Sequence, residues 1–293
     1  MIKYAMKIDG KRISLFIEKQ VKKEARQLKK KTKTLLSCFL VGISADQISF
    51  VKIKSKVAKK LGLEYKLIHL KTFPNFIVFA NMIKDEVNNP NVNGIIIQQP
   101  LPAQLSTDSI YDYIPVVKEI EGHRKKSIFY PPIGLAVMTV IKYIFSGKKI
   151  DKRLFVNLNK DRSFFKKILK NKKIVLLGRG MTGGKPIGHV LQEAKINYIN
   201  VNSQTINPEE YLKTADIIIT AVGKKIIEPS MLKPGVVLIN VGLRKENGKL
   251  KGDYDENEIK DIASYYTPTP GGVGPIDVAY LYKNLVDAAK LQK

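Results

Sequence analysis

Short apolar runs alternate with amphipathic segments through the first half of the chain. A short apolar run bounded by turn residues is typical of a buried strand, whereas apolar residues that recur with the period of a helix are typical of an amphipathic helix. After a short opening strand, the pattern predicts helices over 13–30, 49–61 and 75–87 and strands over 35–41, 65–70 and 94–97. Because strands that alternate with helices pair in parallel, this half predicts a parallel sheet covered by helices.

A second alternation fills the other half of the chain. It predicts strands over 174–177, 198–201, 216–221 and 236–241 and helices over 134–146, 187–194, 208–213 and 276–292. Residues 148–173 carry so many charges that we interpret them as a solvated insertion or linker. Residues 267–275, TPTPGGVGP, contain too much proline and glycine for a helix or a central strand. The 293 residues suffice for about two domains, and the predicted fold class is α/β.

A glycine loop, GRGMTG at 178–183, joins a predicted strand to a predicted helix. Gly178, Gly180 and Gly183 have the G-x-G-x-x-G spacing that binds dinucleotides in this context. The first glycine permits a tight turn, the second lets the backbone approach a pyrophosphate, and the third lets the helix pack on the strand. The alternative is an ordinary glycine-rich turn, because a chain with 20 glycines produces such spacings by chance.

The residues after the next predicted strand favour NADP over NAD. An NAD site has an acidic residue about twenty positions beyond the glycine loop, where it binds the ribose hydroxyls. Here the strand ends in Val201, Asn202 and Ser203, without an acid. Arg179, inside the loop, and Ser203 are suited to bind a 2′-phosphate instead, so we expect NADP as the cofactor.

The formal net charge of +25 allows two interpretations. One is a surface that binds polyanions, and the other is a general bias toward lysine on solvated faces. The basic residues are scattered and mostly lysine, without regular interleaving of aromatic residues, which favours the bias. We therefore expect attraction of anionic small molecules and salt-sensitive, non-specific adhesion to nucleic acid, but no specific nucleic-acid partner.

The cysteine and histidine contents exclude two kinds of site. Cys38 is the single cysteine, so no internal disulfide forms, and its apolar neighbours predict a buried core residue. The three histidines, His69, His123 and His189, are far apart in the sequence, and no structural metal site is expected. Without a membrane-length apolar run or a signal-peptide core, we expect a cytoplasmic protein with no membrane partner.

Five stretches, in order along nearly the whole chain, carry a family resemblance. They are GIIIQQPLP (94–102), GRGMTGGKP (178–186), ADIIITAVG (215–223), VLINVG (237–242) and TPTPGGVGP (267–275). The first stretch leaves the carboxyl end of a predicted parallel strand, which is where ligands of such sheets bind. Together the five resemble the bifunctional methylenetetrahydrofolate dehydrogenase/methenyltetrahydrofolate cyclohydrolases.

The resemblance implies a two-domain α/β protein with a cleft between its domains. Residues 1–146, joined by the C-terminal helix 276–293, would form the catalytic, folate-binding domain, and residues 147–275 a Rossmann-type NAD(P)-binding domain. It implies a homodimer that oxidises methylenetetrahydrofolate by hydride transfer to NADP and hydrolyses the methenyl product to formyltetrahydrofolate. One-carbon metabolism and purine biosynthesis are the processes that this family serves.

The resemblance also assigns residues to a folate site. The family's catalytic tyrosine and lysine, four residues apart, are matched by Phe50 and Lys54, which helical spacing puts on one face. Lys54 would act by proton transfer or by stabilising negative charge, and Gln98 matches the glutamine that positions this lysine. Phe50 keeps a ring to stack on the pterin but lacks the hydroxyl. Glu121 matches the aspartate that holds the pterin's amino nitrogens, with one more methylene.

The motif near the C-terminus supplies the remaining site residues. Pro270, Gly271 and Gly272 match backbone beside the stacked pterin and nicotinamide, and Gly274 matches a cofactor-binding position. Asp277 replaces the family's usual threonine and is expected to cap the last helix.

Three features depart from the family pattern: the residues at 50 and 121, the shortened segment 122–132, and the unusual segment 148–173. They leave two alternatives to the bifunctional enzyme open. One is a dehydrogenase with weak or no cyclohydrolase activity. The other is a degenerate relative without turnover, or a nucleic-acid-binding module, that uses its basic surface for binding.

Overall fold

The computed structural model describes residues 5–29 and 34–292 and divides the chain into two compact units. One unit comprises Ile17–Pro132 and the chain from Val278 onward, and the other comprises the chain up to Phe16 and Ile133–Asp277. Within the described residues, their parallel sheets have three and six strands, and we name the units after these sheets. The predicted α/β fold class with two domains is confirmed.

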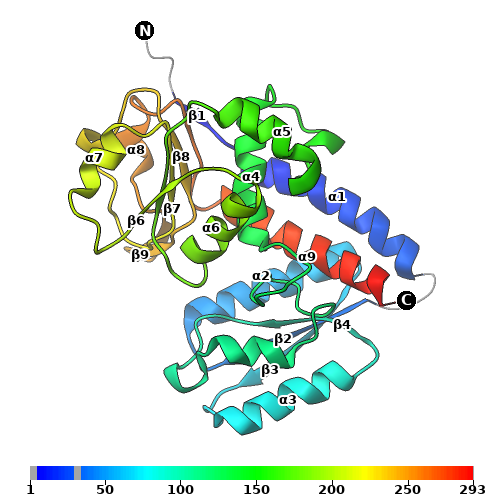
Figure 1. Ribbon diagram of the computed structural model, residues 1–293. Coiled ribbons are helices and arrows are strands. Elements are labelled where there is room, and N and C mark those ends of the chain that lie inside the picture. The colour runs from blue at the N-terminus through cyan, green and yellow to red at the C-terminus, as the bar shows by residue number, and fades with distance from the viewer. Residues whose placement is uncertain (1–4, 30–33, 293) are drawn as a thin grey trace. The chain divides into compact units, whose positions relative to one another are not determined.

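The three-stranded unit has β2 (Leu35–Val41) at the centre of its sheet, between β3 (Glu64–Leu70) and β4 (Val92–Ile97). The chain passes from β2 to β3 through α2 (Ala45–Leu61) and from β3 to β4 through α3 (Phe76–Asn88). Right-handed crossovers in opposite directions place α2 and α3 on opposite faces of the sheet, as Figure 1 shows. Alternate residues of β2 therefore face different helices.

The two faces of β2 are both apolar. Phe39 meets Phe79 of α3 edge-on, with ring centroids 5.6 Å apart. Cys38, on the other face, is fully buried as predicted, and this burial raises the pKa of its thiol to about 11. Gly62 ends α2 with a φ of 76°, a left-handed conformation that glycine adopts without strain. The unit also contains the short 3₁₀ helices η1 (Ala103–Leu105) and η2 (Asp108–Tyr113) and most of α1 (Gly10–Lys29) and α9 (Val273–Leu291).

The first helix was predicted to end at Lys30, and that residue lies outside the described residues.

The six-stranded unit has the strand order β1-β11-β8-β7-β5-β6. Its strands are β1 (Met6–Lys7), β5 (Ile174–Leu177), β6 (Ile199–Val201), β7 (Ile217–Thr220), β8 (Val237–Asn240) and β11 (Tyr265–Tyr266). Its helices are α4 (Pro132–Phe145), α5 (Leu158–Leu169), α6 (Gly184–Glu193), α7 (Pro208–Lys213) and α8 (Glu256–Ile259). The remaining elements are η3 (Lys152–Leu154), η4 (Pro229–Met231) and the antiparallel pair β9 (Arg244–Glu246) and β10 (Lys249–Lys251).

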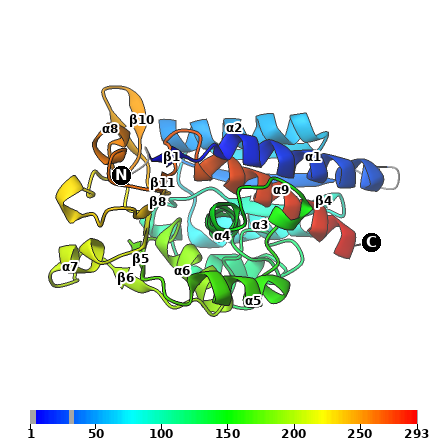
Figure 2. The same ribbon diagram turned by 90° about the horizontal axis from the view of Figure 1, so that it is seen from above.

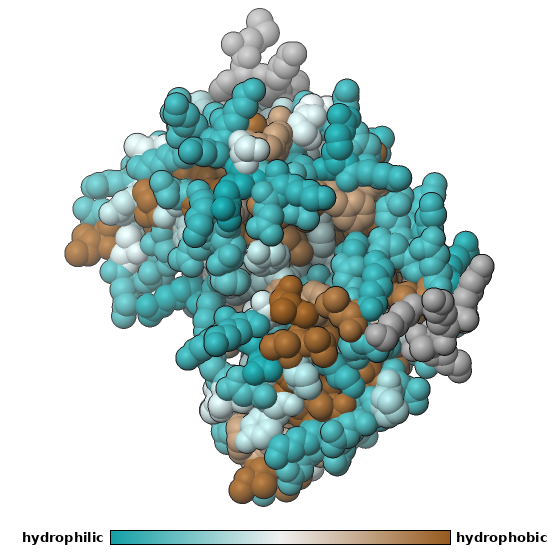
Figure 3. All heavy atoms as spheres, turned by 45° about the vertical axis from the view of Figure 1, so that its right-hand side comes forward, coloured by the Kyte–Doolittle hydropathy of each residue, from teal (hydrophilic) through white to brown (hydrophobic). Residues whose placement is uncertain are grey.

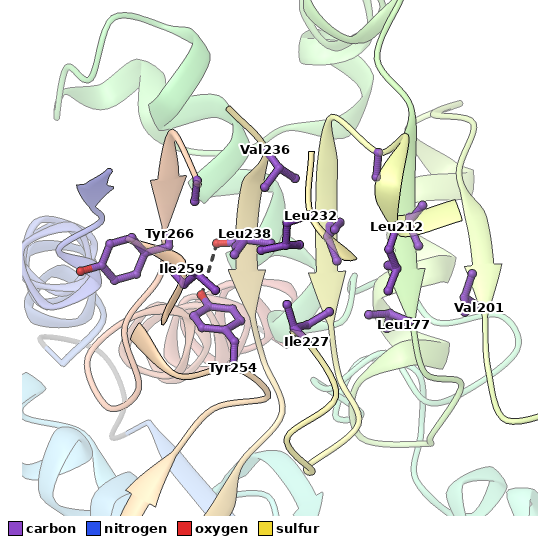
Figure 4. Packing of buried hydrophobic residues seen from close by; sticks show 14 residues of the cluster. Leu177, Val201, Leu212, Ile227, Leu232, Val236, Leu238, Tyr254, Ile259 and Tyr266 are labelled. Atoms are coloured by element: carbon purple, nitrogen blue, oxygen red, sulfur yellow. Dashed lines mark hydrogen bonds between the residues drawn. The ribbon is translucent and has the colours of Figure 1, made fainter. Parts of the chain in front are cut away.

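Helices cover both faces of this sheet. Figures 1 and 2 show α7 and α8 on one face and α4 and α6 on the other. Figure 4 shows the core beneath α7 and α8, where Leu177 and Leu238 of the strands pack with Leu212 and Ile259 of the helices. Tyr254 in this core donates its hydroxyl to the backbone carbonyl of Thr267 at 2.6 Å, so its polar group is satisfied although it is buried.

The interpretation of 148–173 as a solvated insertion or linker is wrong for most of that segment. It contains η3 and α5, and α5 packs on the unit through an apolar face. Lys142 of α4 fixes α5 in place, because its buried amine donates a hydrogen bond to Asp161 Oδ2 at 2.7 Å. The charged residues occupy the outer face of α5, and their number obscured the helical period. The buried apolar residues of the segment are Leu154, Leu158, Phe165 and Leu169.

Helix α9 begins at Val273, inside the motif TPTPGGVGP. The expectation that the whole motif is non-helical is therefore wrong for its last three residues. Pro275 lies in the first turn of α9, where a backbone N–H has no partner within the helix and proline is tolerated. Asp277 consequently lies inside α9, so its expected position as the N-cap is also wrong.

The division between the units falls at other residues than the boundary expected at 146. Helix α4 packs with α6, where Gly134 leaves no room for a Cβ beside Val190, so α4 belongs with the six-stranded sheet. The start of the chain belongs there too, because β1 pairs in parallel with β11.

Hydrophilic residues cover most of the molecular face drawn in Figure 3, with smaller hydrophobic patches between them. This agrees with 51 lysines and arginines spread along the chain rather than gathered in one segment. In the part of the chain that the structure describes, no helix has the length and apolar character needed to cross a membrane.

Candidate functional site

The structure brings Lys54 and Gln98 together at the carboxyl edge of the three-stranded sheet. Lys54 lies in α2, and Gln98 follows the last residue of β4. Lys54 Nζ donates a hydrogen bond to Gln98 Oε1 at 3.0 Å. The Gln98 side chain is fixed at its other end, because its Nε2 donates to the backbone carbonyl of Gln99 at 2.9 Å. The hydroxyl of Tyr282 donates to the Lys54 backbone carbonyl at 2.6 Å, which ties α2 to α9 within this unit.

Glu121 completes the group around the lysine. Its Oε1 lies 3.6 Å from Lys54 Nζ, and the two side chains are 18% and 12% exposed. Partial burial strengthens such a pair relative to one on the open surface, because less water screens it. The three sequence-predicted residues Lys54, Gln98 and Glu121 thus form one cluster, with the amine between an amide and a carboxylate.

A buried acid positions the loop that carries Glu121. Glu119 is 1% exposed, and its carboxylate accepts the backbone N–H groups of Glu121, His123 and Arg124 at 2.9, 3.1 and 3.4 Å. Burial raises the pKa of Glu119, and the nearby His123 and the backbone donors oppose that shift. Asn284 of α9 also fixes this loop, because its side-chain amide donates a hydrogen bond to the Ile120 carbonyl at 2.8 Å. Sequence reasoning missed Glu119, although a second acid two residues before Glu121 was visible.

The loop after β4 is also fixed by side chains that sequence reasoning did not select. The peptide bond between Gln99 and Pro100 is cis. Gln47 of α2 is buried and donates to the Pro100 carbonyl at 2.7 Å, and Gln99 donates to the hydroxyl of Tyr111 at 2.6 Å. These contacts hold Gln98 where Lys54 can reach it.

Phe50 lies one turn before Lys54 in α2 and is partly exposed. Its ring therefore remains available for contact with a ligand on the face that carries Lys54.

The glycine loop of the six-stranded unit runs from the end of β5 to the start of α6, as predicted. Gly178 has a φ of 104°, and a Cβ there would lie 2.6 Å from the Ala221 carbonyl oxygen, so only glycine fits. Gly183, directly before α6, also packs against Ala221, and a Cβ there would lie 2.9 Å from the Ala221 Cβ. A Cβ on Gly180 would meet nothing within 4 Å, so the loop's backbone is uncovered at its middle glycine.

Arg179 and the turn after β6 lie beside each other. The exposed Arg179 side chain donates to Gln204 Oε1 at 3.3 Å, and Ser203, next to Gln204, is exposed. Asn202 closes this turn by accepting the Gln204 N–H at 3.0 Å, so the end of β6 carries an amide where NAD sites carry an acid.

A buried polar network, missed by sequence reasoning, joins the carboxyl ends of β7 and β8 to the segment that contains Pro270. Asn240 accepts a hydrogen bond from Thr220 at 2.9 Å and donates to Thr269 Oγ1 at 2.7 Å. Asp253 accepts the N–H groups of Val222 and Gly223 at 2.9 and 2.8 Å, and burial raises its pKa. The only signal available was the polar residue at the end of each apolar strand.

The predicted residues of the C-terminal motif follow this network directly. The Thr269–Pro270 peptide bond is cis, and Gly271 has a φ of 104°. Gly272 lies against Gly10 at the start of α1, where a Cβ on Gly10 would overlap the Gly272 carbonyl. Gly274, in the first turn of α9, has open space at its Cβ position.

Fold and site together define a class: a two-domain α/β protein with a G-x-G-x-x-G dinucleotide-type loop in one unit and a lysine–glutamine–glutamate cluster in the other. Residues 8–121 match the tetrahydrofolate dehydrogenase/cyclohydrolase catalytic domain, and residues 163–293 match the NAD(P)-binding domain of the same family. The chain belongs to the tetrahydrofolate dehydrogenase/cyclohydrolase family.

Individual relatives agree over the full length. The bifunctional protein FolD of Thermodesulfovibrio yellowstonii is 34% identical over 98% of this chain and 97% of its own. A similar solved structure is the crystal structure of the bifunctional FolD methylenetetrahydrofolate dehydrogenase/cyclohydrolase from Campylobacter jejuni. Its TM-score is 0.85 at 29% identity, and the superposition covers 99% of this chain and 100% of that one. The FolD of Trypanosoma brucei, complexed with NADP cofactor and an inhibitor, shares the fold, with a TM-score of 0.83 at 24% identity over 99% of this chain and 98% of that one.

Proposed function

We propose that this protein oxidises methylenetetrahydrofolate to methenyltetrahydrofolate with NADP and hydrolyses the product to formyltetrahydrofolate. The observation that carries the proposal is the placement of Lys54 Nζ, 3.0 Å from Gln98 and 3.6 Å from Glu121. Of the many lysines in the chain, this one is held by an amide and a carboxylate at the ligand-binding edge of a parallel sheet.

Each member of the cluster has a chemical role in the proposal. Glu121 accepts hydrogen bonds from the amino nitrogens of the pterin, and the Phe50 ring stacks on the pterin face. Gln98 positions Lys54 and keeps its amine directed at the substrate. Lys54 assists the attack of water on the methenyl carbon, by taking up the proton or by stabilising the negative charge that develops. Pro270, Gly271 and Gly272 offer backbone to the folate.

The six-stranded unit has residues that fit NADP. The glycine loop can bind the pyrophosphate through backbone N–H groups. These groups lie near Gly180, where the backbone is open, and at the N-terminus of α6, beside Gly178 and Gly183. Arg179 and Ser203 suit the 2′-phosphate, with Asn202 in place of an acid. Gly274 lies at the start of α9 and suits close approach of the nicotinamide half.

In the oxidation, bound NADP supplies the acceptor for the hydride that leaves the methylene carbon. The protein's part is to fix the pterin by Glu121 and Phe50. In the hydrolysis, a water oxygen bonds to the methenyl carbon and one proton leaves. The bond between that carbon and one ring nitrogen then breaks, the nitrogen takes up the second proton of the water, and the carbon and oxygen remain as the formyl group. The Lys54 amine, fixed by Gln98, takes up the first proton or stabilises the negative charge that develops.

One observation favours a second candidate, a dehydrogenase with weak or no cyclohydrolase activity. Phe50 lacks the hydroxyl of the family's tyrosine, so this position, one helical turn before Lys54, offers no hydrogen bond to a ligand. The dehydrogenase step needs no such hydroxyl, because the hydride acceptor comes from the cofactor.

A single assay distinguishes these functions. Purified protein is mixed with methylenetetrahydrofolate and NADP, and NADPH and methenyltetrahydrofolate are followed together by absorbance. We expect NADPH to form while methenyltetrahydrofolate stays low. Accumulation of the methenyl compound would favour the second candidate, and absence of NADPH would exclude both and favour a relative without turnover.

The family supports further proposals about organisation. We expect a homodimer in the cytoplasm that supplies one-carbon units, for purine biosynthesis among other uses. We also propose that the three-stranded unit, with the C-terminal helix, carries the folate chemistry and that the six-stranded unit binds the nucleotide. Size-exclusion chromatography with light scattering tests the dimer.

A further inference from the structure

Tyr282 of α9 is a buried residue next to the backbone of Lys54, and the roles above do not use it. Its side chain is fully buried, and its hydroxyl donates a hydrogen bond to the Lys54 carbonyl at 2.6 Å. Burial raises the pKa of Tyr282, so the hydroxyl keeps the proton that it donates. The oxygen that accepts this bond belongs to the residue whose amine carries the proposed chemistry.

The Lys54 carbonyl lies in the interior of α2, where a helix carbonyl ordinarily accepts the N–H group of the residue four positions later. A carbonyl oxygen has two lone pairs, so it can accept the tyrosine hydroxyl as well. The bond from Tyr282 is therefore not needed to complete the helix. It ties this one turn of α2 to α9, which lies beside it in Figure 1.

The same helix α9 also holds the loop that carries Glu121. Asn284, two residues after Tyr282, donates from its side-chain amide to the Ile120 carbonyl at 2.8 Å and to the Tyr130 carbonyl at 3.0 Å. Positions two residues apart project to nearly opposite sides of a helix, because each residue turns it by about 100°. Helix α9 thus contacts α2 with one side and the loop with another.

These hydrogen bonds from α9 set the spacing between Lys54 and Glu121. The lysine amine meets Gln98 Oε1 at 3.0 Å and Glu121 Oε1 at 3.6 Å, and Tyr282 holds the backbone from which that amine extends. A lysine side chain is a flexible stem, so the position of its amine depends on what holds each end. A shift of α2 relative to Glu121 would therefore change the geometry of the amine.

We propose that Tyr282 is a positioning residue for the hydrolysis, and that its hydroxyl fixes the Lys54 amine relative to Glu121 through the lysine backbone. This inference rests on the proposed function, in which Lys54 assists the attack of water. Small displacements of a fixed reacting group slow a reaction, because the group leaves its productive geometry. The oxidation takes its hydride acceptor from the cofactor, so we expect only the hydrolysis to depend on Tyr282.

Tyr282→Phe removes the hydroxyl and keeps the ring, and the two activities of one preparation are compared. We expect kcat for hydrolysis of methenyltetrahydrofolate to fall about 5- to 10-fold, the loss that corresponds to one hydrogen bond. The KM for that substrate and the kcat for NADPH formation should each stay within about twofold. A merely structural role would lower both activities alike, because unfolded protein performs neither, and would leave their ratio unchanged.

Tyr254→Phe is the matched control, since that buried tyrosine also donates to a backbone carbonyl at 2.6 Å, but in the six-stranded unit. It should lower the free energy of unfolding and keep the ratio of the two activities within about twofold. In a Lys54→Met background, Tyr282→Phe should change the remaining hydrolysis by less than about twofold, because the amine that it positions is absent. If Tyr282→Phe does not fold, Tyr282→Met takes its place, since methionine also lacks the hydroxyl and adapts to the space of the ring.

An unchanged ratio of the two activities in Tyr282→Phe would overturn the inference alone. A 5- to 10-fold loss that persists in the Lys54→Met background would do the same, because the effect could not then act through the amine. Absence of hydrolysis by the unaltered protein would instead overturn the proposed function, and the inference with it.

Discussion

Lys54 differs from the lysines around it by environment and not by residue type. Lys52 and Lys56, two positions away on either side in α2, are exposed, whereas the Lys54 side chain is 12% exposed and meets Gln98 and Glu121. A helix turns through about 100° per residue, so neighbours two positions apart point to different sides. Lysines in one helix can therefore have different environments.

Replacement of Lys54 by methionine tests that difference. Lys54→Met keeps the side chain's length and removes the amine, so we expect hydrolysis of methenyltetrahydrofolate to fall at least about 100-fold. Lys52→Met is the matched control and should keep its activity within about twofold. Rates are measured from the loss of methenyl absorbance. Full hydrolysis by Lys54→Met would remove the lysine from the mechanism.

In the proposed function, binding of NADP rather than NAD depends on Arg179. The 2′-phosphate is the group that distinguishes NADP from NAD, and Arg179 is the exposed cation of the glycine loop beside Ser203 and Gln204. Arg179→Ala should raise the KM for NADP roughly 10- to 100-fold, because a charge-assisted hydrogen bond is worth about 1.5–3 kcal/mol. The KM for NAD serves as the internal control and should stay nearly constant. An equal rise in KM for both cofactors would show that Arg179 does not act through the 2′-phosphate.

At the scale of elements, regular alternation of strand and helix was readily predicted, and segments fixed by distant partners were not. Strand 35–41 and helix 208–213 were predicted at the bounds that the structure shows, because each has a clear period and clear ends. The predicted short opening strand is present as β1, but its pairing with β11 could not be read from the sequence. Strand β11 was missed, because its two residues form a strand only by pairing with β1 and β8. Helix α5 was missed because its outer charges outnumber its buried residues.

The site shows the same limit. Physical reasoning predicted ligand binding at the end of β4 and at the glycine loop, since both follow parallel strands. Lys54 could be chosen only through the family resemblance, because helical spacing does not distinguish one lysine among several. Asn240 acts through side chains far along the chain, Thr220 and Thr269, and Glu119 acts through backbone N–H groups of its own loop. Such contacts appear only in the folded structure.

Phe165 tests the packing of α5. It is fully buried, whereas a residue in a solvated linker would be exposed. Phe165→Ala should lower the free energy of unfolding by about 3–5 kcal/mol, through lost burial and the cavity left behind. Lys166→Ala, at the next and exposed position, should change it by less than about 0.5 kcal/mol. Denaturant titration followed by circular dichroism measures both, and a neutral Phe165→Ala would restore the linker interpretation.

At the scale of the whole molecule, the proposed chemistry does not explain the net charge of +25. Anionic substrates and NADP benefit from a positive molecule, because long-range attraction raises their encounter rates. That benefit requires only a diffuse charge, in agreement with lysines distributed over both units. A specific polyanion site would require the cations to gather on one surface and act together.

The strength and the sequence preference of DNA binding distinguish these two arrangements. For diffuse charge, a fluorescent DNA duplex should bind detectably at low ionic strength, and its dissociation constant should be weaker than about 10⁻⁶ M at physiological salt. The affinity should not depend on base sequence, and excess NADP should displace little DNA, because the duplex does not occupy the nucleotide site. A steep fall in affinity between about 50 and 200 mM salt is expected, since binding would come from release of counterions. Fluorescence anisotropy with two unrelated duplexes measures all of this. Binding tighter than about 10⁻⁸ M at physiological salt, or a clear preference for one duplex, would instead indicate a dedicated nucleic-acid surface.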